Sequence, residues 1–280
     1  MSAAFEEARR LDAGDPLAGF REEFVFPERI DGRSPVYFCG NSLGLMPRRA
    51  ADAVRAELEA WGRLAVRGHT EGEHPWMSAH RSAAAPLAEL VGGLPAETVA
   101  MNTLTVNLHL LMASFYRPQG ERRAIVIESD AFPSDRYAAA SQIAWHGHDP
   151  GRDLLEWHPR EGEHRLRTED LAALLERRGH EIALLLLPGV QYYTGQYLDM
   201  AEICRLARHH GVTVGLDLAH AVGNVPLSLH DWGADFAVWC SYKYLNGGPG
   251  AVAGAWVHEG HCGDRSLPRL LGWWGHEEST

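Results

Sequence analysis

The stretch VTVGLDLAHAVGNVPLSLHDWGADFAVWCSYKYLNGGPG, residues 212–250, decides the fold. It contains two apolar runs, at 212–218 and 235–240, that predict buried strands separated by a helix-length segment. Asp217 lies at the end of the first run, and Lys243 follows just after the second. Because parallel strands end at one edge of a sheet, we expect both side chains at the edge where ligands of such sheets bind.

Lys243 is the only lysine in the chain, since the other 25 of the 26 basic side chains are arginines. Lysine differs from arginine because it can lose its proton near neutral pH and attack a carbonyl group to form a Schiff base. The single lysine therefore indicates chemistry with a carbonyl compound. A surface lysine that survived by chance explains the count equally well at this point.

Asp217 ends a mostly apolar strand, where a carboxylate is costly unless it meets a positive partner. The protonated ring nitrogen of a pyridine cofactor is one such partner, and His220 follows three residues later. The alternative is a structural aspartate that caps the following loop.

The rest of the chain continues the alternation of strands and helices. Residues 47–61 open with proline and place apolar side chains on one stripe of an amphipathic helix. The other predicted helices are 104–116, 136–145, 168–178 and 199–211, and the other predicted strands are 124–128, 154–157, 182–187 and 251–257. This order implies an α/β fold, with a mostly parallel sheet flanked by helices on both faces.

The composition, with 280 residues of which 45% are apolar and 22% charged, is that of an ordinary globular protein. The net charge of -11 and the lack of a basic stretch argue against nucleic acid as a partner. No run reaches the about 18 apolar residues of a membrane span, and the acidic start lacks a signal-peptide core, so we expect a cytoplasmic protein without membrane contact. The four cysteines form no CxxC pair and are expected to be reduced and mostly buried.

Other polar residues also map to the expected ligand edge. Thr105 begins a predicted helix, whose free N–H groups suit a phosphate, although threonine is also a common helix cap. Phe132, Ser134 and Asp135 follow the strand at 124–128, where the aromatic ring could stack on a planar ligand or fill the core. The 16 histidines show no ligand spacing with an accompanying acid, so no metal site is expected.

Together these residues and the sequence motifs around them resemble the kynureninase family. Its members are fold type I pyridoxal-phosphate enzymes of the aminotransferase class V superfamily. The resemblance runs from Tyr37 to the last residue and rests on YFCGNSLGL, HPWM, NTLTVNLHLLMASFY, ESDAFPSDRYA, GVQYYTGQ, GWWGHE and the stretch quoted first. It implies a fold type I large domain and pyridoxal phosphate as the cofactor. Cysteine desulfurases share this fold but not these sequence motifs.

The resemblance also implies roles for individual positions. Lys243 would carry the Schiff base and later move protons, Asp217 would pair with the pyridine nitrogen, and Tyr242 would act as an acid. The other cofactor residues would be Leu104 and Thr105 at the phosphate, Phe132 on the ring, Ser134, Asp135 and His220 in the polar shell, and Trp273 at the phosphate of a neighbouring subunit. Ser42 and His69 match positions near the aromatic end of the substrate, and Trp273 implies a homodimer with shared active sites.

The implied reaction is hydrolytic cleavage of a carbon–carbon bond in L-kynurenine or 3-hydroxykynurenine, in tryptophan degradation and NAD biosynthesis. The products would be L-alanine and anthranilate or 3-hydroxyanthranilate. Family members are longer, so we expect an N-terminal segment at 1–40, a cofactor-binding large domain at 41–260, and at 261–280 the start of a connection to a missing C-terminal domain. That missing part would hold the arginine for the substrate carboxylate. Pro188 replaces a serine of some relatives and removes one hydroxyl contact.

Two other functions stay open. The chain could be a truncated, catalytically silent protein that binds the cofactor or dimerises. It could also be another class V lyase or a desulfurase, which we disfavour because no cysteine is expected in an exposed, glycine-rich mobile loop.

Overall fold

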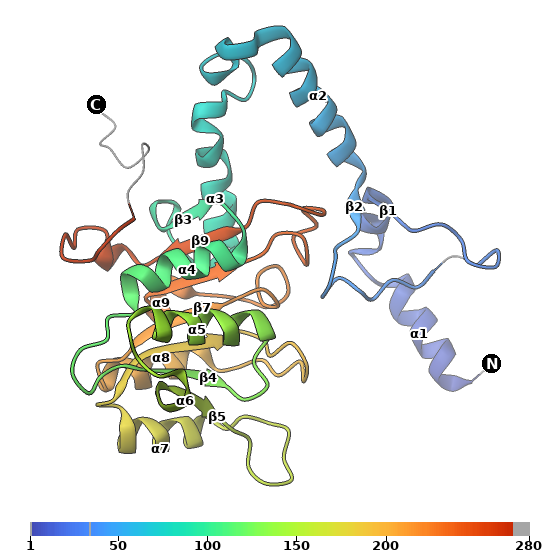
Figure 1. The fold of residues 1–280 in the computed structure, drawn as a ribbon. Coiled ribbons are helices and arrows are strands. Elements are labelled where there is room, and N and C mark those ends of the chain that lie inside the picture. Colours follow the sequence, from blue (N-terminus) through green and yellow to red (C-terminus); the bar gives the residue numbers. More distant parts are fainter. Residues whose placement is uncertain (1, 34, 271–280) are drawn as a thin grey trace.

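The main sheet of the computed structural model, which describes residues 2–33 and 35–270, has the strand order β3-β9-β8-β7-β6-β4-β5 in these residues (Figure 1). β9 runs antiparallel to both of its neighbours, and every other adjacent pair is parallel. The strands are β3 (Thr98–Ala100), β4 (Ala124–Glu128), β5 (Leu154–Trp157), β6 (Ile182–Pro188), β7 (Thr213–Asp217), β8 (Phe236–Trp239) and β9 (Gly254–Val257). The mostly parallel α/β sheet expected from the sequence is confirmed, whereas β3 was not foreseen.

The predicted helices are all present, with small differences at their ends. The α-helices are α1 (Ala3–Ala13), α2 (Arg48–Leu64), α3 (Ala79–Val91), α4 (Leu104–Phe115), α5 (Pro133–Trp145), α6 (Pro150–Asp153), α7 (Thr168–Arg178), α8 (Met200–His209) and α9 (Leu229–Trp232). α5 starts three residues earlier than expected because Pro133 suits the first turn of a helix. None of the helices in the described ranges is long and apolar enough to cross a membrane.

Short elements complete the described chain. They are the antiparallel pair β1 (Phe24–Val25) and β2 (Met46–Pro47) and the 3-10 helices η1 (Ala18–Glu23), η2 (Ala65–His69), η3 (Trp76–Ser78), η4 (Pro95–Glu97) and η5 (Glu259–His261).

Two apolar cores lie on opposite faces of the sheet, because alternate residues of each strand point to opposite sides. In β6, Leu184 and Leu186 belong to the core that α4 and α5 cover, whereas Leu185 and Leu187 belong to the core under α3, α7, α8 and α9. The helices thus cover both faces and leave the strand ends accessible. β4 and β7 end at Glu128 and Asp217, and the loop after β8 carries Lys243.

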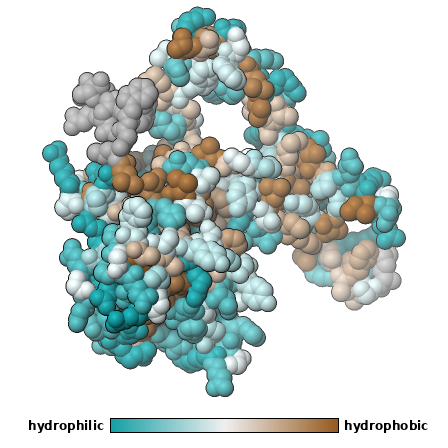
Figure 2. All heavy atoms as spheres, viewed as in Figure 1, coloured by the Kyte–Doolittle hydropathy of each residue, from teal (hydrophilic) through white to brown (hydrophobic). Residues whose placement is uncertain are grey.

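Helix α2 projects from the α/β unit (Figure 1), and the other described residues do not cover its apolar stripe. Val54, Leu58 and Trp61 are exposed, and the indole of Trp61 retains 65% of its accessible surface. The amphipathic helix is confirmed, but its apolar face does not pack into either core. Figure 2 shows hydrophobic side chains at the surface of α2 and of the segment before it.

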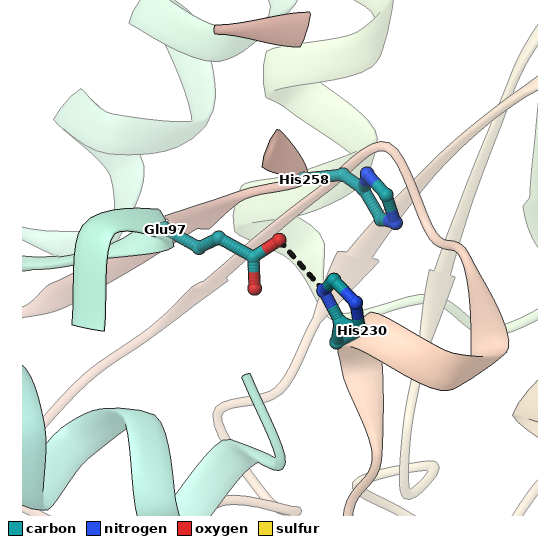
Figure 3. A group of neighbouring side chains, drawn as sticks. All are labelled: Glu97, His230 and His258. Atoms are coloured by element: carbon teal, nitrogen blue, oxygen red, sulfur yellow. Dashed lines mark hydrogen bonds and ion pairs between the residues drawn. The ribbon is translucent and has the colours of Figure 1, made fainter. Parts of the chain in front are cut away.

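The buried carboxylate of Glu97 accepts hydrogen bonds from three segments of the chain, and Figure 3 shows the contact with His230. Its two oxygens accept hydrogen bonds from the backbone N–H groups of Leu94 (2.8 Å) and Glu259 (2.8 Å), the indole of Trp256 (3.0 Å) and Nδ1 of His230 (2.9 Å). Burial favours the neutral acid, but these donors outweigh it and lower the pKa of Glu97, so the side chain stays ionised. The ring of His258 stacks on that of His230 at 5.1 Å.

Glu97→Gln replaces an acceptor oxygen with an NH2 group that faces two of these donors. We expect it to lower the free energy of unfolding by roughly 2 kcal/mol or more, because buried donors lose their partner. Glu121→Gln, at an exposed position, is the matched control and should change it by less than about 0.5 kcal/mol. Chemical denaturation measures both. Equal stability of the two variants would contradict the role assigned to Glu97.

Candidate active site

A cavity opens at the carboxyl edge of the sheet. The predicted cofactor residues that the structure describes all line it, namely Leu104, Thr105, Phe132, Ser134, Asp135, Asp217, His220, Tyr242 and Lys243. Trp273 lies outside the described residues. Its predicted role, like the individual roles of the others, stays a prediction.

Lys243 is buried in this cavity and contacts His220. The distance from Lys243 Nζ to His220 Nε2 is 2.8 Å. Burial and the charge of Lys243 lower the pKa of His220 to about 4, so the imidazole is neutral at pH 7. A neutral imidazole can accept a hydrogen bond from the lysine and fix the position of its amine.

Asp217 and Asp135 form a pair of buried carboxyl groups beside the lysine. Asp217 also accepts a hydrogen bond from the backbone N–H of Ala219, at 2.7 Å. Burial raises the pKa of both carboxyl groups, and the hydrogen bond between them raises that of Asp135 while it opposes the rise at Asp217. Burial of two neighbouring carboxyl groups therefore favours a pair that shares one proton.

One oxygen of this pair, Oδ1 of Asp135, is buried without a hydrogen-bond partner among the described residues. Such groups are rare because an unpaired buried acceptor costs free energy. A donor on a ligand in the cavity would satisfy it.

Two helix N-termini meet at one corner of the cavity. Leu104 and Thr105 are the first residues of α4, and Ser134 is in the first turn of α5. The hydroxyl oxygens of Thr105 and Ser134 are 3.1 Å apart. Free N–H groups at the start of helices attract anions, so this corner suits a phosphate.

Phe132 presents its ring to the cavity and is 45% exposed, which disfavours a core role. Tyr192 packs edge-on against it, with ring centroids 5.2 Å apart, and Lys243 Nζ lies 5.6 Å from the centroid of the Phe132 ring. An exposed ring that is held in place this way can stack on a planar ligand.

Tyr242 stays a neutral phenol at pH 7, since burial and the neighbouring Cys240 raise its pKa to about 12. A neutral hydroxyl that lines the cavity can donate a proton. This property is compatible with the acid role expected from the sequence.

The structure does not bring Ser42 or His69 into the cavity lining. Ser42 is exposed in a turn, and the exposed His69 ends η2, where its ring meets Trp76 edge-on at 5.7 Å. The chain near Ser42 does touch the lysine loop, because Gly44 N–H donates to the carbonyl oxygen of Tyr242 at 2.8 Å. The substrate roles of both residues stay predictions.

The model of the family described as Aminotransferase class-V matches residues 36–257. The chain belongs to this family.

Among curated relatives of this class V chain, the kynureninase of Myxococcus xanthus is 56% identical over 98% of this chain and 64% of its own length. The kynureninase of Nematostella vectensis is 50% identical over 98% of this chain and 62% of its own length. The chain therefore spans about two thirds of the length of the relatives it matches.

Solved structures share the fold of this class V chain. The cystine C-S lyase C-DES in complex with cysteine persulfide has a TM-score of 0.68 at 21% identity, over 85% of this chain and 60% of that one. An apo cysteine desulfurase from Thermococcus onnurineus has a TM-score of 0.60 at 17% identity, over 81% of this chain and 54% of that one. A second C-DES structure, a variant with glycine covalently linked to its PLP cofactor, has a TM-score of 0.67 at 20% identity, over 92% of this chain and 62% of that one.

Class V membership supports pyridoxal phosphate as the cofactor, in agreement with the sequence-based expectation. The residues present fit this group. Lys243 offers an amine to the aldehyde, the Thr105 corner offers N–H and hydroxyl groups to the phosphate, and the unpaired oxygen of Asp135 awaits a donor.

Sequence reasoning missed several residues of the class V site. These residues are Glu128, Val190, Tyr192 and Ala219, which line the cavity, whereas Pro188, also in the lining and paired with Asp217 across β6 and β7, was named from the sequence. Glu128 could have been found by the argument used for Asp217, because it too ends an apolar strand.

The cysteines depart from the sequence-based expectation. All four are free, but Cys39 and Cys262 are exposed and each precedes a glycine, and only Cys204 and Cys240 are buried. The expectation of mostly buried thiols is therefore wrong. A desulfurase was disfavoured because no exposed cysteine beside glycine was expected. Since two such cysteines are present, an experiment must distinguish desulfurase activity from the other functions.

Glu97, His230 and His258 are close enough to be considered as metal ligands. Their geometry favours a structural role. The planes of the two imidazoles differ by 7°, so the in-plane lone pairs of the stacked rings do not converge on one point. Both Glu97 oxygens are already engaged by four donors.

Gly44 leaves no room for a side chain against the lysine loop. A Cβ at this position would lie 2.3 Å from the carbonyl oxygen of Lys243 and 2.7 Å from Nδ2 of Asn246. We expect Gly44→Ala to lower the free energy of unfolding by about 1–3 kcal/mol and to weaken cofactor binding, because the loop must move.

The control for Gly44→Ala is Gly62→Ala, on α2, where no atom lies within 4 Å of the added Cβ. This change should be neutral or stabilise the chain by up to about 1 kcal/mol. Thermal unfolding and a cofactor titration measure both effects. Cofactor affinity that is equal in the two variants would contradict the contact proposed between the Gly44 segment and the lysine loop.

Proposed function

We propose that this chain carries the cofactor half of a kynureninase. The proposed reaction is hydrolysis of L-kynurenine or 3-hydroxykynurenine to L-alanine and anthranilate or 3-hydroxyanthranilate, as a step of tryptophan degradation. The observation that carries the proposal is the single cavity in which Lys243 meets the other described cofactor residues. Relatives named kynureninase, at 50–56% identity, favour this reaction over others of the family.

Pyridoxal phosphate, when bound, supplies an electron sink for the bonds at the substrate's α carbon. Asp217 lines the cavity, and its carboxylate would pair with the ring nitrogen and keep it protonated. Nζ of Lys243, which lies 2.8 Å from Nε2 of His220, would hold the cofactor and later carry the proton from the α carbon. When water adds to the γ carbonyl and the bond from that carbon to the β carbon breaks, anthranilate would leave as the acid, and Tyr242 would donate the proton that the β carbon takes up.

The expected homodimer with shared active sites is part of the same proposal. The exposed apolar stripe of α2 supports it, since unpartnered apolar surface marks interaction sites. The cytoplasmic location and the domain boundaries at 40 and 260 stay predictions.

The direct test is an assay for anthranilate and alanine after incubation of the 280-residue chain with cofactor and L-kynurenine. L-cysteine serves as the competing substrate in the presence of dithiothreitol, which reduces the sulfur that is released, so the products of that reaction are sulfide and alanine. Anthranilate formation that requires the cofactor supports the proposal. Cofactor binding without product would favour the silent alternative for this chain, and sulfide release would favour a desulfurase or lyase.

Tyr242→Phe removes the proposed acid but keeps the ring. We expect kcat to fall by about 100-fold or more, because general acid catalysis typically contributes that much, with cofactor affinity nearly unchanged. Tyr137→Phe, at an exposed position on α5, is the matched control and should retain full turnover. Steady-state kinetics and a cofactor titration separate the two effects. Equal turnover in Tyr242→Phe and the parent would contradict the acid role.

A further inference from the structure

Glu128 is a buried carboxyl group of the cavity that the proposed reaction does not use. It ends β4, whose sequence AIVIE is otherwise apolar, and only 4% of the residue is exposed. It lines the cavity together with Asp135 and Asp217. Ionisation of a carboxyl group in such a position costs free energy, so the group keeps its proton unless a positive charge is near.

The charges around Glu128 come from three directions. Asp217 faces it from β7, Asp135 from α5 and Asp130 from the loop after β4. Its strand partner on β5 is the uncharged Trp157, and β6 ends nearby at Pro188. Lys243 is the cation of the cavity, and it acts on Asp135 and Asp217.

Glu128 keeps its proton because acidic groups outnumber cations around it. Burial, and then the charges of Asp217 and Asp130, raise the pKa of Glu128 to about 8. At pH 7 the group is therefore mostly neutral. A cation that enters the cavity offsets the negative charge of the carboxyl groups. It therefore favours ionisation of a second carboxyl group.

We propose that Glu128 is a positioning residue that gives up its proton when a cationic ring occupies the cavity, and so couples cofactor binding to pH. The proton passes to solvent, and the new carboxylate adds its charge to that of Asp217 opposite the ring. This inference rests on the cofactor of the proposed function and goes beyond it. By linkage, affinity for the cationic ring must then rise with pH through the range in which free Glu128 titrates.

The test uses pyridoxine 5′-phosphate, which has the ring and phosphate of the cofactor but no aldehyde, so it cannot react with Lys243. Calorimetric titration at pH 7.5 in two buffers of different ionisation enthalpy counts the protons released on binding. For the parent chain we expect a release of about half a proton or more per site, and an affinity that rises several-fold between pH 6.5 and 8.5.

In Glu128→Gln, which cannot ionise, the release should fall by that amount and the rise in affinity with pH should be lost. At pH 6, Glu128 of the parent is neutral both with and without the probe. The affinity of Glu128→Gln for the probe at this pH should therefore stay within about twofold of that of the parent. Glu121→Gln is the matched control, since Glu121 is an exposed acid before the start of β4 that neither lines the cavity nor acts on Glu128. It should bind with the proton release of the parent.

Equal proton release and equal pH dependence in the parent and Glu128→Gln would overturn the inference, because the proton would then come from the Asp135–Asp217 pair. Should Glu128→Gln fail to fold, infrared difference spectra of the parent and Glu128→Asp replace it. Loss of a protonated carboxyl band on binding, at a frequency that shifts in Glu128→Asp, supports the inference, and an unshifted band overturns it. Absence of probe binding in the folded parent would overturn this inference and the proposed cofactor together, whereas the product assay tests the reaction alone.

Discussion

Three buried carboxyl groups share one cavity with a single ammonium group, and the chemistry of the site depends on that imbalance. Glu128, Asp135 and Asp217 cannot all be ionised beside Lys243 alone, because each uncompensated charge would lose its hydration without a partner. The cluster therefore stores protons in the free protein. A ligand that brings a positive ring nitrogen relieves the imbalance, and this property selects a pyridinium cofactor over neutral or anionic rings.

The fold creates this arrangement through the order of its strands. β4, β7 and β8 run parallel to one another, so their carboxyl ends place Glu128, Asp217 and the Lys243 loop along one edge. The helices that follow β3 and β4 start at the same edge and bring their N-termini to the phosphate corner. The Gly44 segment then closes on the lysine loop through the hydrogen bond to Tyr242. Along this one edge, the ring nitrogen of a phosphorylated pyridine would meet the carboxyl groups, and its phosphate would meet the helix N-termini.

Much of this was predictable from local patterns. Alternating apolar runs and helix-length segments predict the sheet, and the positions of Asp217 and Lys243 after two runs predict that they meet. Glu128 was missed although its strand gives the same signal, because the argument about buried carboxylates was applied to one strand only. β3 is too short to stand out, and only its pairing with β9 defines it. The exposed stripe of α2 was not predictable either, because an amphipathic pattern does not say whether the same chain covers the apolar face.

The central claim is that Lys243 is the residue that holds pyridoxal phosphate. Because the chain has one lysine, borohydride reduction of the cofactor-loaded protein followed by peptide mapping tests the claim directly. The account predicts one pyridoxyl group per chain, on the peptide that contains Lys243, and no such label in Lys243→Ala. An unlabelled Lys243 peptide, or a label that persists in Lys243→Ala at the N-terminal amine, would contradict it.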